Sequence, residues 1–166
     1  MTDDGVTDIL PLAAVTPDAG MRQRLLGALF EACFDEPYGA AAVATLLTAP
    51  GSRALLAQRT ADGASQAAGY VIVRLAADEA EILSLGVVPA ARRMGVGRAL
   101  LAAAVSQAGA AGAAAVFLEV GEDNTAARAM YAAAGFTPVG RRPDYYQRAD
   151  RSRISAIIMR KSLRRT

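Results

Sequence analysis

Apolar positions recur along the chain with two spacings, and these predict helices and strands in turn. Over residues 18–33 they fall three or four apart, which is the spacing of one helix face, and Asp18 suits the N-cap. The same spacing over residues 96–108 predicts a second long helix. Shorter helices are expected near residues 40–47 and over residues 125–134.

Runs rich in β-branched and other apolar residues, bounded by turn residues, predict strands between these helices. The predicted strands cover residues 8–15, 53–59, 67–74, 79–88, 114–121, 136–140 and 154–160. The second and third form a hairpin across Asp62-Gly63. Because helical and strand-like segments alternate without a long linker or an internal repeat, we expect one mixed α/β domain over residues 1–166.

Composition narrows the chemistry that the chain can perform. Of its 166 residues, 53% are hydrophobic and 20% charged, which excludes a disordered or fibrous protein. The absence of histidine excludes His-ligated metal sites, Ser-His-Asp or Cys-His nucleophiles and imidazole acid–base catalysis. Cys33, the one cysteine, can form neither an intrachain disulfide nor a cysteine zinc cluster, and its place on an apolar helix face favours packing. Catalysis must therefore rest on carboxylates, tyrosines, arginines and backbone groups.

Charge is unevenly distributed along the chain. Residues 1–140 carry nine basic and fourteen acidic side chains, a balance of −5, whereas residues 141–166 carry nine and two, a balance of +7. The basic end either faces an anionic partner, such as ribosomal RNA or a phosphorylated cofactor, or is a solvated arginine-rich strand. Neither a basic secretory region at the start nor an apolar run of roughly 18 residues occurs, so we expect a cytoplasmic protein.

The most informative stretch is residues 88–101, which read VPAARRMGVGRALL. A strand ends at the proline, and a glycine loop opens directly into the helix predicted at 96–108. Gly95 and Gly97 allow backbone N–H groups to approach a phosphate closely, and the helix N-terminus adds partial positive charge beside three arginines. The pattern is neither GxGxxG nor a Walker loop. It predicts an anion site, unless it is a plain glycine turn among surface arginines.

A second group of residues lies in the strand predicted at 114–121 and the helix after it. Glu119 interrupts an apolar strand, where a carboxylate is costly unless it is paired, solvated in a cleft or functional. Tyr131, twelve residues later, can reach the same cleft from the returning helix, which would bring together a base and an acid. Alternatively, Glu119 is a strand-end charge and Tyr131 is a core tyrosine with its hydroxyl at the edge.

Taken in order, R-x-x-G-x-G, L-E-V, Asn124 and A-x-x-x-Y-x-x-x-G-F resemble the GNAT family of acetyl-CoA-dependent N-acetyltransferases. The likeness is clearest over residues 67–161. It implies an α/β fold with a mixed, mostly antiparallel sheet of about seven strands, splayed between two central strands, and about four helices. It also implies that acetyl-CoA is the cosubstrate and that no metal is required.

The resemblance assigns the contacts to acetyl-CoA residue by residue. The pyrophosphate would lie on backbone N–H groups at 93–98, and the pantetheine arm between the strands at 79–88 and 114–121. The Val87 N–H would polarise the thioester carbonyl. The cosubstrate-binding residues are then Leu85, Val87, Arg92, Arg93, Gly95, Val96, Gly97, Arg98, Asn124 and Tyr131. Asn124 suits the N-cap of the helix at 125–134 equally well.

The same resemblance assigns the catalytic and acceptor residues. Glu119 would take a proton from the incoming ammonium, directly or through water, and Tyr131 would protonate the departing CoA thiolate. Finer features resemble the RimI-type branch, which acetylates the N-terminal alanine of protein eighteen of the small ribosomal subunit. A peptide slot would then be lined by Phe34, Tyr38, Tyr145 and Tyr146. The tyrosine pair also fits an ordinary aromatic cluster at a strand edge.

The chain departs from that branch directly after the tyrosine pair. Gln147 and the basic stretch 148–153 stand where the branch has a proline and an acidic or glycine-rich turn. Two other functions therefore stay open: a GNAT enzyme for another amine, such as a lysine side chain, an antibiotic or a polyamine, and a non-catalytic module that binds acyl-CoA. Glu119 and Tyr131 together argue against the module. We expect no contact with DNA or membrane, and a monomer or weak dimer.

Overall fold

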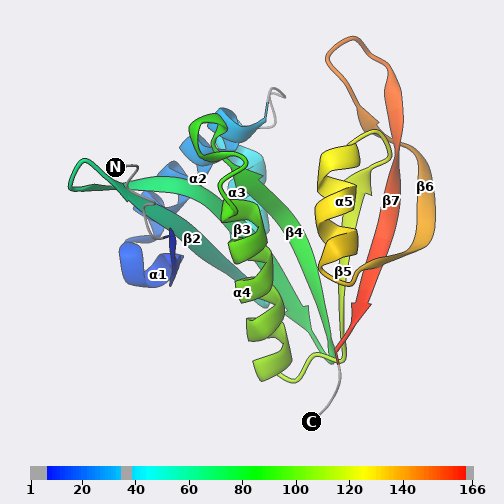
Figure 1. Ribbon diagram of the computed structural model, residues 1–166, viewed down its shortest axis with the longest axis horizontal. Helices are drawn as coiled ribbons and strands as arrows, with labels where there is room; N and C mark the ends of the chain where they lie inside the picture. Colours follow the sequence, from blue (N-terminus) through cyan, green and yellow to red (C-terminus); the bar gives the residue numbers. More distant parts are fainter. Residues whose placement is uncertain (1–6, 35–38, 164–166) are drawn as a thin grey trace.

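The computed structural model describes residues 7–34 and 39–163, which form one mixed sheet with helices on both faces (Figure 1). The helices are α1 (Leu12–Val15), α2 (Ala19–Cys33), α3 (Gly39–Thr48), the 3₁₀ turn η1 (Pro89–Ala91), α4 (Val96–Ala110) and α5 (Thr125–Ala133). The strands are β1 (Thr7–Pro11), β2 (Ser52–Ala61), β3 (Ala64–Ala76), β4 (Glu79–Val87), β5 (Ala115–Gly121), β6 (Thr137–Gln147) and β7 (Arg153–Ser162). They lie in the order β1-β2-β3-β4-β5-β7-β6.

The centre of the sheet is split. All neighbouring strands are antiparallel except β4 and β5, which run parallel and pair only over residues 79–82 and 115–118. Beyond that point β4 stays paired with β3 as far as Val87, and β5 stays paired with β7 as far as Gly121. A bulge in β4 leaves Leu83 without a partner on β3 where the split begins, and bulges bend strands. The two strands consequently diverge, as Figure 1 shows.

Both faces of the sheet are apolar because side chains alternate along each strand. On β3, Val71 and Val73 join the core under α4 and α5, whereas Tyr70 and Ile72 join a second core under α1, α2 and α3. In Figure 1, α4 and α5 lie on one face and α2 and α3 on the other. Buried leucine, valine and alanine side chains of α4 fill the first core, as its helical spacing predicts. The predicted fold class is confirmed.

The expected strand at residues 8–15 is half wrong. It ends at Pro11, and the chain turns into α1, with the Thr16 N–H donating to the Leu12 carbonyl at 3.0 Å. Proline has no N–H for a strand ladder, and the helical turn buries Leu12 in the second core. None of the helices in the described ranges, 7–34 and 39–163, is long and apolar enough to cross a membrane.

The strand expected at 136–140 is too short, because β6 runs on to Gln147. Nearly all its residues are exposed, so no apolar alternation marks it, and Pro143 with Asp144 reads as a turn. Those residues form a bulge, in which three residues of β6 face only Ser155 of β7. The Asp144 N–H donates to the Ser155 hydroxyl at 3.3 Å. The other predicted elements agree with the structure to within a few residues.

Candidate active site

A cleft of about 990 Å³ opens where β4 and β5 diverge. Its walls come from the end of α2, the outer half of β4, the end of β5, α5 and the β6–β7 hairpin. Most of the predicted catalytic and acceptor residues, and part of the predicted cosubstrate set, meet there. The predicted residues that line the cleft are Phe34, Leu85, Arg92, Glu119, Asn124, Tyr131, Tyr145 and Tyr146. Tyr38 lies outside the described residues.

Glu119 is the first residue of β5 beyond the stretch that pairs with β4. Leu118 and Val120 on either side point into the core under α4, so the Glu119 side chain projects from the other face. It is 17% exposed, and its Oε1 forms an ion pair with Arg142 Nε at 2.8 Å. This ion pair offsets part of the cost of burying the carboxylate. The strand therefore presents a charged, largely buried carboxylate to the cleft.

Tyr131 reaches the cleft from α5. Only 7% of it is exposed, and its ring packs edge-on against Phe136 with the centroids 6.0 Å apart. Burial raises the pKa of Tyr131 above the usual value for a phenol, so the hydroxyl is protonated at neutral pH. No hydrogen bond to this hydroxyl comes from the part of the chain that the structure describes. The phenol is thus a proton donor without a competing acceptor in that part.

The tyrosine pair of β6 forms an aromatic wall beside Glu119. The rings of Tyr145 and Tyr146 lie 5.0 Å apart in an edge-on arrangement, and both are partly exposed. Burial raises the pKa of Tyr146 to about 12, and the nearby charge of Glu119 adds to the effect. Phe34 lies at the end of α2 on Phe30, with the ring centroids 4.9 Å apart. These rings give the cleft an apolar section next to its carboxylate.

The last residues of β4 direct backbone N–H groups toward the gap between β4 and β5. The Val88 N–H donates to the Ala68 carbonyl at 2.9 Å, so it points toward β3. Because successive residues of a strand direct their N–H groups to opposite sides, those of Leu85 and Val87 point toward β5, which has already diverged. Among the described residues no strand pairs with these amide groups on that side, whereas β5 pairs with residues 79–82 of β4.

The side chain of Arg92 has a structural task. Its Nε donates to the Val87 carbonyl at 3.2 Å, and a terminal nitrogen donates to the Cys33 carbonyl at 3.0 Å. It thereby ties the end of α2 to the end of β4. Cys33 itself is buried, and burial raises the pKa of its thiol, as the packing interpretation predicts. A contact of Arg92 with the cosubstrate stays a prediction.

The glycine loop ends in a helix start that has no side-chain cap. The side chains of Asp18 and Asn124 cap α2 and α5. The N-cap residue of α4 is Gly95, which has no side chain that could cap the helix. Gly95 has a φ of 80°, a left-handed conformation that glycine adopts without strain. The N–H groups of residues 96–98 therefore have no helical acceptor. Together with the exposed Arg93 and Arg98 they fit the predicted anion site, which stays a prediction.

Two predicted residues of this region also have structural roles. The Oδ1 of Asn124 accepts a hydrogen bond from the Ala127 N–H at 3.2 Å, so the capping alternative is confirmed. At Gly97 a Cβ would lie 3.1 Å from the sulfur of Met130, so its small size lets α4 approach α5 closely. A contact of Asn124 or Gly97 with acetyl-CoA stays a prediction.

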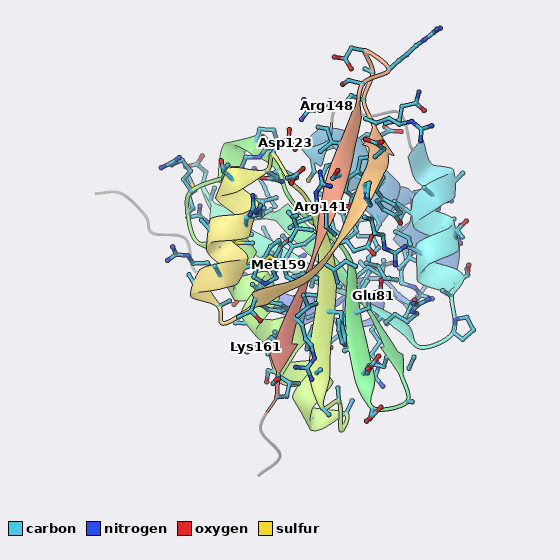
Figure 2. The ribbon with its side chains drawn as sticks, turned by 90° about the vertical axis from the view of Figure 1, so that its right-hand side faces the viewer. Glu81, Asp123, Arg141, Arg148, Met159 and Lys161 are labelled. Atoms are coloured by element: carbon cyan, nitrogen blue, oxygen red, sulfur yellow. The ribbon has the colours of Figure 1, made fainter. Side chains whose placement is uncertain are left out.

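Sequence reasoning missed the ion pairs around the cleft. Arg142 pairs with Glu119, and Arg148 pairs with Asp123, which joins the β6–β7 hairpin to the loop before α5 (Figure 2). These partners are 23 and 25 residues apart in sequence and meet only because β7 lies between β5 and β6. One signal was available: a carboxylate in an apolar strand needs a cation. Nothing in the sequence says which arginine supplies it.

Comparison with known proteins decides the family. The family model described as "Acetyltransferase (GNAT) family" matches residues 23–136. The chain belongs to the GNAT family. It is an acetyltransferase with acetyl-CoA as its acetyl donor, as the resemblance of its motifs implies.

Individual relatives of this GNAT protein carry a narrower name. The [ribosomal protein bS18]-alanine N-acetyltransferase of Haemophilus ducreyi is 37% identical over 90 residues, which are 54% of this chain and 62% of that protein, less than two thirds. The enzyme of the same name from Escherichia coli K12 is 36% identical over 115 residues, 69% of this chain and 76% of that one. A crystal structure of the Escherichia coli ribosomal-protein-S18-alanine N-acetyltransferase superposes with a TM-score of 0.79 at 26% identity, covering 97% and 96% of the two chains.

Proposed function

We propose that this GNAT enzyme acetylates the N-terminal amino group of a peptide, with the N-terminal alanine of ribosomal protein bS18 as its target. The observation that carries the proposal is that Glu119 and Tyr131 line the same cleft, beside an aromatic wall. The relatives named as bS18-alanine N-acetyltransferases support the choice of acceptor.

The residues present fit acetyl-CoA. The uncapped start of α4, with Arg93 and Arg98, would hold the pyrophosphate. The open edge of β4 would hydrogen-bond the pantetheine amides through Leu85 and Val87, in the manner of an added strand. When bound, acetyl-CoA supplies the activated acetyl group. The Val87 N–H then stabilises negative charge as it develops on the thioester oxygen.

The two side chains divide the proton transfers between them. Glu119 accepts a proton from the acceptor ammonium, directly or through water, because only the neutral amine has a lone pair to form the new C–N bond. As the C–N bond forms, the C–S bond breaks and Tyr131 donates its phenolic proton to the leaving sulfur. The second proton that the nitrogen loses on becoming an amide returns through water to the Tyr131 phenolate. Because burial raises the pKa of Tyr131, that proton is present at neutral pH. Each proton transfer contributes about 10²- to 10⁴-fold to the rate, and orientation supplies much of the rest.

The acceptor end of the cleft suits a peptide. Phe34, Tyr145 and Tyr146 line it from two different elements, and Tyr146 lies close enough to Glu119 to feel its charge. Aromatic walls bury an extended chain on two sides while the carboxylate selects its ammonium. Tyr38 belongs to the same predicted slot.

The test is a CoA-release assay with two matched peptides. One copies the N-terminus of bS18, and the other carries a blocked N-terminus and a free lysine. Turnover of the first alone supports the proposal, and turnover of the second alone contradicts the choice of acceptor. Glu119→Gln should abolish most turnover of the first peptide near neutral pH, with partial recovery as the pH rises and more amine is already neutral. A pH–rate profile identical to that of the wild type would exclude Glu119 as the base.

A further inference from the structure

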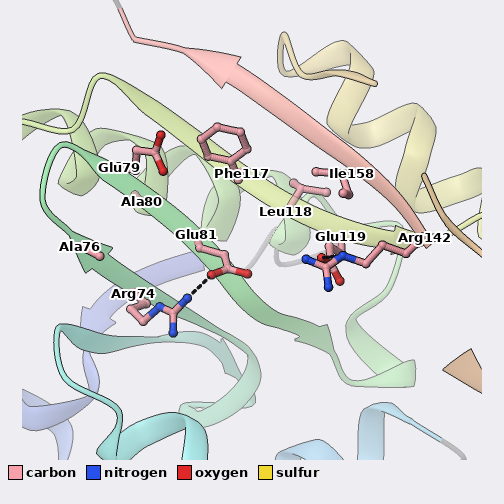
Figure 3. Close-up of a pocket in the computed structure, with 10 residues that line it drawn as sticks. All are labelled: Arg74, Ala76, Glu79, Ala80, Glu81, Phe117, Leu118, Glu119, Arg142 and Ile158. Atoms are coloured by element: carbon pink, nitrogen blue, oxygen red, sulfur yellow. Dashed lines mark hydrogen bonds and ion pairs between the residues drawn. The ribbon is translucent and has the colours of Figure 1, made fainter. Parts of the chain in front are cut away.

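Glu119 is reached from two cavities, not one. Besides the cleft, it lines a smaller cavity of about 240 Å³ between the beginning of β4 and the middle of β5 (Figure 3). Arg142 lines this smaller cavity and is absent from the cleft wall. The arginine therefore meets the carboxylate on the side of the smaller cavity, and the ion-pair contact of 2.8 Å joins Arg142 Nε to Oε1.

The arginine is itself held in place. It lies on β6, and its guanidinium packs over the ring of Tyr145, 5.4 Å from the centroid. The bulge at residues 143–145 follows directly and fixes how β6 turns its side chains toward β5. Arg142 thus links the carboxylate to the aromatic wall of the acceptor slot.

The other arginines nearby are already engaged. Arg74, across the small cavity, pairs with Glu81 at 2.5 Å (Figure 3), and Arg141 pairs with Glu122 at 3.1 Å. Of the cations in the described parts of the chain, Arg142 is the ion-pair partner that Glu119 has. A carboxylate on a β-strand has two free side-chain torsions beyond Cβ, so one fixed partner decides where its second oxygen points.

We propose that Arg142 is a positioning residue. Its ion pair with Oε1 of Glu119 fixes the orientation of the carboxylate, so that Oε2 faces the acceptor amine in the cleft. The inference rests on the proposed function of Glu119 as the base. Arg142 does not touch the acceptor or acetyl-CoA. Its effect passes through the direction and charge of the carboxylate, and misplacement of a reacting group by about 1 Å costs on the order of 100-fold in rate.

The neighbouring Arg141 provides a matched control. The two arginines are adjacent on β6, and each pairs with a glutamate. The Arg142 side chain is 54% exposed and the Arg141 side chain 52%. Arg141 and its partner Glu122 lie outside both cavities. Arg142→Gln should lower kcat about 10- to 100-fold, with the KM for acetyl-CoA unchanged. Arg142→Lys should restore most of the activity, and Arg141→Gln should stay within about twofold of the wild type. Thermal melting checks that each variant is folded.

A double variant separates positioning from direct contact. If Arg142 acts only through Glu119, Glu119→Gln with Arg142→Gln is no slower than Glu119→Gln alone, whereas independent roles would multiply. Multiplied losses, or full activity of Arg142→Gln, overturn the inference. All variants are assayed on whichever amine the wild type acetylates, so failure of the bS18 peptide refutes the proposed acceptor separately. Full activity of Glu119→Gln removes both the base and its positioning residue.

Discussion

Replacing Tyr131 with phenylalanine tests the proposed role of Tyr131 as the general acid, with little disturbance of the fold. The change keeps the ring that packs on Phe136 and removes only a hydroxyl that makes no hydrogen bond within the described parts of the chain. No buried partner is left unsatisfied, so the free energy of unfolding should change by less than about 0.5 kcal/mol. For a protein of this length that is a shift in Tm of about 1–2 °C.

The kinetic effect should be far larger than the structural one. Loss of a general acid costs about 10²- to 10⁴-fold in kcat, which is about 3–5 kcal/mol of transition-state stabilisation. Acetyl-CoA affinity, measured by calorimetry, should be nearly unchanged, because binding rests on the β4 edge and the start of α4. The assay is CoA release at saturating acetyl-CoA, with Tm as the folding control. Wild-type turnover would refute the acid role, and a large loss of affinity would make Tyr131 a binding residue instead.

Two further predictions concern stability and the cap of α5. Burial raises the pKa of Tyr70 and brings that of Tyr146 to about 12, so above about pH 10, where phenols of the unfolded chain lose protons, the folded protein still holds them. Stability should therefore fall as the pH rises from 10 to 12, and Tyr70→Phe should make a plot of Tm against pH less steep. Asn124→Ala should cost about 1 kcal/mol of stability and Asn124→Ser little; an equal rise in the KM for acetyl-CoA in both variants would show a direct contact with the cosubstrate.

The fold could be predicted where a buried element shows a regular spacing of apolar residues in the sequence, and not elsewhere. Helix α4 and strand β5 each have an apolar face or run, and their ends match the prediction closely. Strand β6 has none, because it is an edge strand with exposed residues on both faces, and its proline lies in a bulge that such a strand tolerates. The one-residue bulge at Leu83 also leaves no mark in the sequence, since nothing about a leucine shows that it lacks a partner on β3.

The candidate site could be predicted as a set of residues but not as an arrangement. The glycine loop and the strand carboxylate were visible because each violates a local rule: glycines before a helix, and a charge in an apolar strand. The partner of that charge was not visible, because Arg142 meets Glu119 only through β7, two strands away in the sheet. The task of Arg92 in tying α2 to β4 was hidden for the same reason.

The residues proposed to transfer protons are buried, whereas those proposed to bind the acceptor are exposed. Glu119 and Tyr131 are largely buried on β5 and α5, and their positions follow from a split in the sheet that packing fixes on both sides. The residues that would meet the acceptor, Phe34 and Tyr145, are 38% and 50% exposed at the end of a helix and beside a bulge. The departure of this chain from the RimI-type pattern begins at Gln147, the last residue of β6, and continues through the turn that leads to β7. It can therefore change which amine is bound without moving the base or the acid.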